Sequence, residues 1–147
     1  MSTARLRRIA DATGLDLSHS PAPEGVPPLL DALRSVANWE TRPSATVPVG
    51  QAGALAEVDR LWHLHARRCG LFAVDGAFLL GVSGPGAAQA GWAVVRWRDG
   101  ARLAAGLARP EEGLDFVAMS VDGRVVCGVI EEDDDYWIVV QEQAQGQ

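Results

Sequence analysis

At 147 residues the chain has the length of one domain, and its content of 48% hydrophobic and 22% charged residues is ordinary for a soluble globular protein. All 13 basic residues are arginine, which excludes a Schiff-base or phosphate-loop lysine and is typical of a GC-rich bacterial genome. Residues 1–70 hold 8 Arg and 7 acids, a net +1, whereas residues 71–147 hold 5 Arg and 12 acids, a net −7, and this acidic second half argues against nucleic-acid binding.

The helical signals lie in residues 1–70, which the periodicity divides into three helices and two connectors. The predicted helices cover about residues 2–13, 29–37 and 54–69. The third has the clearest apolar stripe, and it should lie across the sheet. This stripe consists of Leu55, Val58, Leu61, Trp62, His65 and Cys69. Of the proline-rich and glycine-rich connectors, residues 15–26 should be loop and residues 40–51 could contain a short edge strand at Val47 and Val49.

From Leu71 onward the apolar period changes to two, which predicts strands. Seven are predicted: Leu71–Val74, Ala77–Val82, Gly91–Arg98, Ala101–Leu107, Leu114–Val121, Arg124–Ile130 and Tyr136–Gln141. Asp-Gly pairs follow three of the runs, at 75–76, 99–100 and 122–123, and this dipeptide is a strong signal for a type I′ hairpin turn. Short connections within this half exclude parallel crossovers.

These elements predict one α+β domain over residues 1–147. About three N-terminal helices should pack on one face of a roughly seven-stranded antiparallel meander with Asp-Gly hairpins. The helical half is residues 1–70, the meander is residues 71–141, and residues 142–147 are predicted to be a disordered tail.

The glycine-rich segment Gly81-Val82-Ser83-Gly84-Pro85-Gly86 resembles two catalytic loops, but the favoured interpretation is a flexible hairpin loop from Ser83 to Ala90. A nucleophile elbow needs glycine where Pro85 stands and a helix after it. A phosphate loop needs a lysine and a helix N-terminus, which are both missing. No other stretch places a nucleophile, a base and an orienting carboxylate close together, so we assign no catalytic residue.

His63 and His65 lie two residues apart on the third predicted helix, so they point to different sides and cannot share a metal. His65 and Cys69 are four residues apart and could face the same ligand, but two ligands do not make a metal site. The favoured interpretation is a buried, hydrogen-bonded His65 beside a buried thiol, with His63 in solvent. We assign no metal and no cofactor.

The acidic run consists of Glu131, Glu132, Asp133, Asp134 and Asp135, and it should occupy the tip of the last hairpin. Its spacing does not match the D-x-[DN]-x-[DN]-G pattern of a calcium loop. The plainest interpretation is a solvated turn that discourages edge pairing. Adjacent carboxylates repel one another, however, which folding alone would not select. The main alternative is therefore docking of a basic partner surface, and weak binding of a divalent ion is a lesser one.

Five tryptophans are many for this length. On the strand predicted at 91–98, Trp92 and Arg96 face one way and Trp97 the other, and the last strand is also apolar on both faces. Helices sufficient for one face imply that connectors, a dimer partner or a ligand cover the second. Trp92, beside Arg96, should be partly exposed, and exposed Trp and Arg carry binding energy at interfaces. We therefore assign Trp92, Arg96 and Trp137 to partner binding together with the acidic run.

The two cysteines, Cys69 and Cys127, lie in apolar surroundings, which favours buried free thiols in a reducing compartment. The N-terminal residues contain no apolar core of a signal peptide. The longest weakly charged run, residues 71–95, is interrupted by Asp75 and by the glycine-rich segment, so it would make a poor membrane helix. The predicted location is the cytoplasm, with no membrane contact.

Two functions remain open at this point. The first is a non-catalytic protein-interaction module of a bacterial cytoplasm, such as an adaptor, an immunity-type inhibitor or a chaperone, which binds a partner with a basic surface and could form a homodimer. The alternative is a small-molecule-binding protein or enzyme with a pocket between the helix at 54–69 and the sheet. His65, Cys69 and Cys127 would be its ligand-binding residues.

Overall fold

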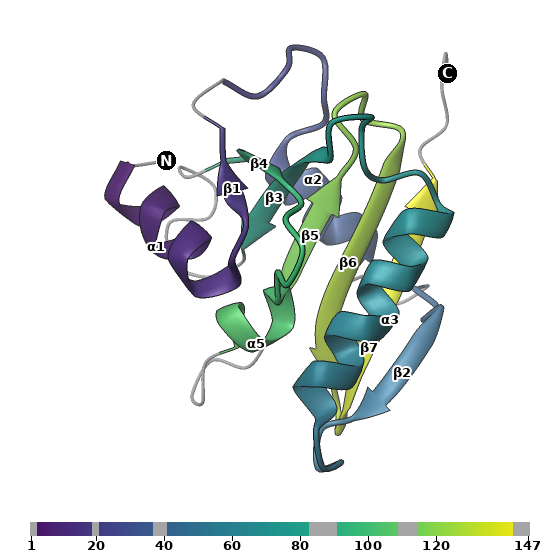
Figure 1. The fold of residues 1–147 in the computed structure, drawn as a ribbon. Helices are drawn as coiled ribbons and strands as arrows, with labels where there is room; N and C mark the ends of the chain where they lie inside the picture. The colour runs from purple at the N-terminus through teal and green to yellow at the C-terminus, as the bar shows by residue number, and fades with distance from the viewer. Residues whose placement is uncertain (1–2, 19–20, 37–40, 83–90, 109–114, 143–147) are drawn as a thin grey trace.

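The computed structural model describes residues 3–18, 21–36, 41–82, 91–108 and 115–142. In these residues, four helices are interspersed with a seven-stranded antiparallel sheet (Figure 1). The helices are α1 (Thr3–Thr13), α2 (Leu29–Val36), α3 (Ala54–Arg68) and α5 (Leu103–Leu107). The strands are β1 (Asp16–Leu17), β2 (Ala45–Pro48), β3 (Ala77–Val82), β4 (Ala93–Arg96), β5 (Phe116–Met119), β6 (Val125–Glu132) and β7 (Asp135–Glu142). The predicted α+β class is confirmed, whereas residues 143–147 of the predicted tail lie outside the described residues.

The strand order is β1-β4-β3-β5-β6-β7-β2, and every neighbouring pair is antiparallel. The prediction of a pure meander is wrong, because β5 pairs with β3 rather than with β4. The chain passes from β4 to β5 through α5, which lets β5 enter the sheet on the free side of β3. At one edge, β2 is the short strand predicted around Val47. At the other, β1 pairs with Arg96 and Val95 although its segment was expected to be loop.

Two predicted strands are absent from the sheet as described. Residues 71–74 follow α3 and lead into a turn, because Gly70 adopts a φ of 79° and the amide of Leu71 donates to the carbonyl of Ala66 at 3.0 Å. This bond closes the last turn of the helix. Residues 101–107 contain α5 instead of a strand, because Asp59 on α3 accepts hydrogen bonds from the amides of Ala104 and Ala105 at 2.7 and 3.2 Å. A capping partner so distant in sequence leaves no local signal.

The Asp-Gly pairs form three turns with different roles. Gly76, Gly100 and Gly123 have positive φ values of 85°, 90° and 76°, as the dipeptide predicts. Only the pair at 122–123 joins two strands as a hairpin; the pair at 75–76 precedes β3, and the pair at 99–100 leads into α5. The prediction of a type I′ turn between β5 and β6 is wrong. Such a turn needs a positive φ at Asp122 as well as at Gly123, and Asp133 is the one non-glycine of the described residues with positive φ. Asp122 instead accepts a hydrogen bond from the Ser120 hydroxyl at 2.6 Å.

Helices cover both faces of the sheet, contrary to the prediction that all of them pack on one. Figure 1 shows α3 in front of the sheet and α2 behind it. One buried cluster joins the sheet to α3, α5 and α1, and a second joins it to α2. The predicted alternation on the third strand is confirmed, because Ala93 and Val95 belong to the first cluster while Trp92 and Val94 pack on the second. The second face is thus covered by α2 and the connector before it.

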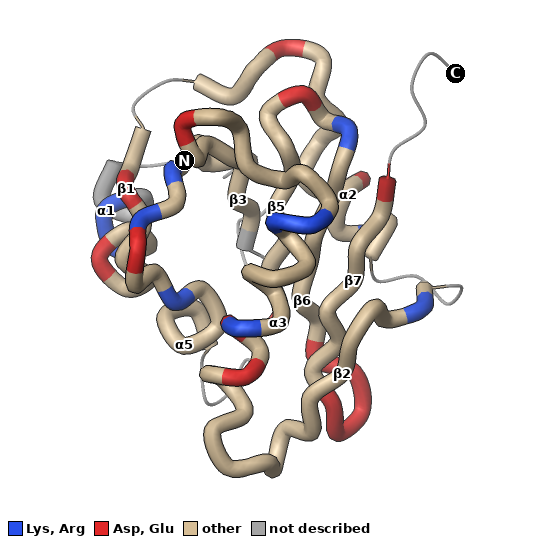
Figure 2. The backbone as a smooth tube through the Cα atoms, turned by 45° about the vertical axis from the view of Figure 1, so that its right-hand side comes forward, with Lys and Arg blue, Asp and Glu red and all other residues tan. Residues whose placement is uncertain are grey.

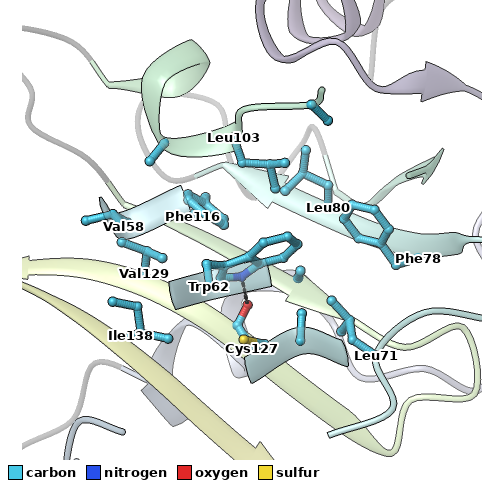
Figure 3. Close-up of a cluster of buried hydrophobic side chains, with 14 of the residues drawn as sticks. Val58, Trp62, Leu71, Phe78, Leu80, Leu103, Phe116, Cys127, Val129 and Ile138 are labelled. Carbon is cyan, nitrogen blue, oxygen red and sulfur yellow. Dashed lines mark hydrogen bonds between the residues drawn. The ribbon is translucent and has the colours of Figure 1, made fainter. Parts of the chain in front are cut away.

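The centre of the larger core is Trp62 on α3, which is 1% exposed. Its ring lies 5.9 Å from that of Phe78 and 5.8 Å from that of Phe116, measured between centroids. Its indole Nε1 donates a hydrogen bond of 3.1 Å to the backbone carbonyl of Cys127 on β6 (Figure 3). Trp62 therefore fixes α3 across the middle of the sheet, where the stripe predicted it.

Candidate functional site

The acidic run occupies the turn of the longest hairpin, β6–β7, as predicted. Both strands have eight residues, and residues 126–130 of β6 are buried because helices cover both faces. The register places Glu132 opposite Asp135 and Glu131 opposite Tyr136. Residues 131–134 are exposed. We name the end of this hairpin, residues 131–135, the acidic tip; Figure 2 shows it in red at the β6–β7 turn.

The backbone of the acidic tip is held by three strands. Asp133 has a φ of 54°, a left-handed conformation that Asp tolerates better than most residues. The amide of Val49, just after β2, donates to the carbonyl of Asp134 at 2.8 Å. The carboxylates therefore project from a defined turn.

A sixth carboxyl group lies beside the acidic tip. Asp115 precedes β5, and its Oδ1 accepts a hydrogen bond from the amide of Glu131 at 3.0 Å. Burial raises the pKa of Asp115 above its ordinary value, the hydrogen bond from Glu131 lowers it, and the charges of Glu131 and Glu132 raise it further. Sequence reasoning missed this residue, because only the pairing of β5 with β6 brings it to the tip.

Electrostatic repulsion within the acidic tip is not relieved by arginine in the part of the chain that the structure describes. Ion pairs join Arg60 to Glu57, Arg96 to Asp75, and Arg98 to Asp16, and none of these pairs includes a residue of the acidic tip. Like charges directly opposite each other in a hairpin destabilise it. Residues 115–142 contain eight acids and one Arg, a net charge of −7. The negative charge of this segment is therefore larger than the net charge of −6 of the entire chain.

The structure separates the three residues predicted to bind a partner with the acidic run. Trp137 on β7 is half-buried, pairs with Ile130 and Thr46, and lies next to the acidic tip. Trp92 is also half-buried, as predicted, but β4 is four strand spacings from β7, about 19 Å. Its Nε1 donates to the carbonyl of Pro27 at 2.9 Å.

Arg96 lies at the opposite end of the sheet from the acidic tip. It pairs with Ala77, the first residue of β3, whereas the tip lies beside the start of β5, which runs antiparallel to β3. Its guanidinium forms an exposed ion pair of 3.4 Å with Asp75. Of the three predicted residues, the structure thus brings Trp137 alone to the acidic tip.

The residues of the alternative pocket lie between α3 and the sheet. Cys127 on β6 is fully buried in the core that contains Trp62, while Cys69 directly after α3 is half-buried. His65 is half-buried rather than buried, because Ala66 takes the core position expected of it. Side chains of Val58, Trp62 and Ala66 occupy the layer in which the pocket would lie.

His63 does not point freely into solvent, contrary to prediction. Its ring stacks on that of Trp97, with centroids 4.2 Å apart and planes at 12°. Burial lowers the pKa of His63, the nearby charge of Arg67 lowers it too, and Asp99 opposes them. Trp97 follows β4 and Phe72 follows α3, so the rings that surround His63 come from outside the helix and its spacing could not reveal them.

The geometry defines an α+β protein with helices on both faces of an antiparallel sheet. No protein-family model, no curated protein and no solved structure matches the chain. None of the described helices combines the length and apolar character needed to cross a membrane. Within the described ranges, no three or more His, Cys, Asp or Glu side chains are grouped so as to hold a metal ion.

Proposed function

We propose that this chain is a non-catalytic protein-interaction module that docks a basic surface of a partner protein through its acidic tip. The observation that carries the proposal is the direct pairing of Glu132 with Asp135 in a hairpin whose exposed acids have no ion-pair partner among the described residues. This arrangement costs folding stability. The positive charges of a basic partner would attract these carboxylates and offset their mutual repulsion.

The rigidity of the acidic tip supports this role. A tip held by the β6–β7 ladder and by the bond from Val49 to Asp134 loses little conformational freedom on binding. Concentrated negative charge also accelerates encounter with a basic surface, an effect that salt weakens. Binding through this tip should therefore be fast and sensitive to ionic strength.

Apolar side chains beside the acidic tip would complete the interface. Val49 is 36% exposed, and its amide is bonded to the turn itself. Trp137 is half-buried at the same end of β7. An aromatic anchor within a polar rim is the usual source of binding energy in protein interfaces. Trp92 and Arg96 lie too far away to belong to this surface.

The roles that fit such a module are an adaptor, an immunity-type inhibitor or a chaperone in a bacterial cytoplasm. The test is affinity capture from host lysate at low and moderate salt, with bound proteins identified by mass spectrometry. A tip variant carries Glu131→Gln, Glu132→Gln, Asp133→Asn, Asp134→Asn and Asp135→Asn. These changes remove five charges while keeping the size of each side chain, and Asn tolerates the left-handed conformation at position 133.

A matched control keeps the acidic tip and removes five exposed charges elsewhere. It carries Asp11→Asn, Glu24→Gln, Asp31→Asn, Asp99→Asn and Glu142→Gln. The wild type and the control should capture the same protein at low salt and lose it as salt rises, while the tip variant captures little. Equal capture by the tip variant and the control would overturn the proposal.

Small-molecule binding between α3 and the sheet remains a prediction with less support. Cys127 is 0% exposed, so a ligand would have to displace core side chains to reach it. In that case Cys69→Ala or His65→Ala should abolish ligand binding with little change in the melting temperature.

A further inference from the structure

The two cysteines, which are 58 positions apart in the sequence, meet in the core between α3 and β6. Both are free thiols. The bond from the Trp62 indole to the carbonyl of Cys127 places the buried side of α3 on this part of β6. Cys69 follows Trp62 by seven residues, two helical turns, and so lies on the same side of the helix.

The two side chains are neighbours in the core, because Cys69 packs against the buried cluster that contains Cys127 and each thiol shifts the pKa of the other. The Cys69 thiol also lies 3.5 Å from the carbonyl of Ala66, a residue of the same core. The two cysteine side chains therefore share one part of the core in the existing strand pairing.

The two thiols differ in exposure and in acidity. Cys69 is half-buried at the end of α3, whereas Cys127 is 0% exposed. The hydrogen bond from Cys127 lowers the pKa of Cys69, and burial and the charge of Glu142 oppose this. The same hydrogen bond and burial raise the pKa of Cys127. Cys69 is thus the accessible thiol with more thiolate character, and thiolates are the species that peroxides oxidise.

We propose that Cys69 and Cys127 form an oxidisable thiol pair, in which a peroxide oxidises Cys69 and Cys127 then closes an intramolecular disulfide. In the first step, the Cys69 thiolate attacks a peroxide oxygen, the O–O bond breaks, and the leaving hydroxide takes up the proton that Cys69 released. Cys69 becomes a sulfenic acid and one water is formed.

In the second step, the Cys127 sulfur attacks the sulfenic sulfur, the S–S bond forms and the S–O bond breaks. The hydroxyl group leaves as water with the proton from Cys127. In sum, two thiols lose two electrons and two protons, and hydrogen peroxide is reduced to two waters.

The end of α3 allows the small movement that a disulfide requires. The bond needs a shorter sulfur–sulfur distance and a preferred dihedral angle. Cys69 is the last residue before Gly70, which has a φ of 79°, so the adjustment falls where the helix already ends. Such terminal residues change conformation more easily than the paired strand β6. This inference is independent of the proposed partner.

The test is oxidation of the full, reduced chain with hydrogen peroxide in the presence of dimedone, which traps sulfenic acids. In the wild type, intact-mass spectrometry should show the loss of two hydrogen atoms, and digestion should yield one peptide pair linked through Cys69 and Cys127. Dithiothreitol should reverse the change. Dimedone should label little protein, because Cys127 consumes the sulfenic acid first.

Two single-cysteine variants test which thiol reacts with the peroxide first. Cys127→Ala should accumulate a dimedone adduct on Cys69, at least several-fold above the wild type, and Cys69→Ala should leave Cys127 unlabelled. If Cys127→Ala does not fold, the linked peptide pair in the wild type remains the deciding measurement. A wild type that accumulates the adduct on Cys69 without a linked pair, or that links two chains through Cys69, would overturn the proposal.

Discussion

Trp62 connects α3 to the sheet by two kinds of contact. Its ring packs among Phe78, Phe116 and other aromatic side chains, and its Nε1–H donates to the carbonyl of Cys127 (Figure 3). A buried Trp usually needs a partner for its N–H group, and the backbone of β6 supplies it here. This single residue thus combines a large apolar surface with a fixed orientation of the helix.

Trp62→Ala should lower the free energy of unfolding by about 3–5 kcal/mol, because it leaves a cavity in the core. Trp62→Phe should cost less, since it keeps a ring but loses the hydrogen bond. Urea unfolding followed by circular dichroism measures both. A loss below about 1 kcal/mol for Trp62→Ala would show that the core does not depend on this side chain.

The stacked pair of His63 and Trp97 predicts a depressed imidazole pKa, because burial disfavours the charged ring. The folded state therefore binds this proton less readily than the unfolded chain, so His63 lowers the stability of the fold as the pH falls below the ordinary pKa. An NMR titration should place the pKa of His63 below the ordinary value of a histidine. Trp97→Ala should return the His63 pKa toward its ordinary value, and an unchanged pKa in that variant would contradict this explanation.

At the scale of elements, the β6–β7 hairpin serves both the fold and the proposed site. Residues 126–130 in its middle are buried between the two helical layers, whereas residues 131–134 at its tip are exposed and acidic. Strand pairing brings Asp115 to the same place. The hairpin is therefore stable enough at its centre to carry an unfavourable group of charges at its end.

Glu132→Gln should stabilise the fold by about 0.2–1 kcal/mol, because it removes one of two like charges that face each other. Added salt should reduce the difference, since it screens the repulsion in the wild type. Glu142→Gln is the control, because Glu142 faces Val125 rather than an acid. Thermal unfolding measures both variants, and an equal effect of the two would mean that the pairing of acids carries no particular cost.

The raised pKa of Asp115 predicts how the stability of the fold changes with pH. Its pKa is higher in the folded chain, chiefly through burial, so it stabilises the fold below the unfolded pKa and this contribution is lost as the pH rises through the folded pKa. Asp115→Asn keeps an acceptor for the Glu131 amide without the charge. The variant should gain stability over the wild type at neutral pH, and the gain should shrink toward acid pH. A difference in urea unfolding that does not vary with pH would contradict this.

The elements differ in how far the sequence predicts them. The helix α3 and the order β5–β6–β7 were predicted correctly, because local periodicity and turn residues determine them, although of the predicted α3 stripe only Val58 and Trp62 are fully buried. Residues 101–107 were predicted as a strand, yet the cap from Asp59, 45 positions from Ala104, makes them helical. The acidic tip was recognisable in the sequence as five consecutive acidic residues. The positions of Asp115 and Val49 beside it depend on strand pairing, which no local pattern encodes.

At the scale of the whole molecule, the buried core lies at the centre of the sheet, whereas the negative charge is concentrated at one end. Helices on both faces bury the centre of the sheet, which accounts for the apolar character that both faces of its strands show in the sequence. The excess negative charge is carried by residues 115–142 and is densest at one end of the sheet. A field of this kind steers basic partners toward that end.

The central claim is that the acidic tip binds a basic partner, and the most direct measurement is the low-salt capture yield of the tip variant relative to the five-charge control. Both variants have the same net charge, so the ratio reports where the charges lie rather than how many there are. We predict that the control retains most of the wild-type yield, while the tip variant retains at most about a tenth, a loss of about 1.4 kcal/mol or more in binding. Equal yields from two folded variants would contradict the claim.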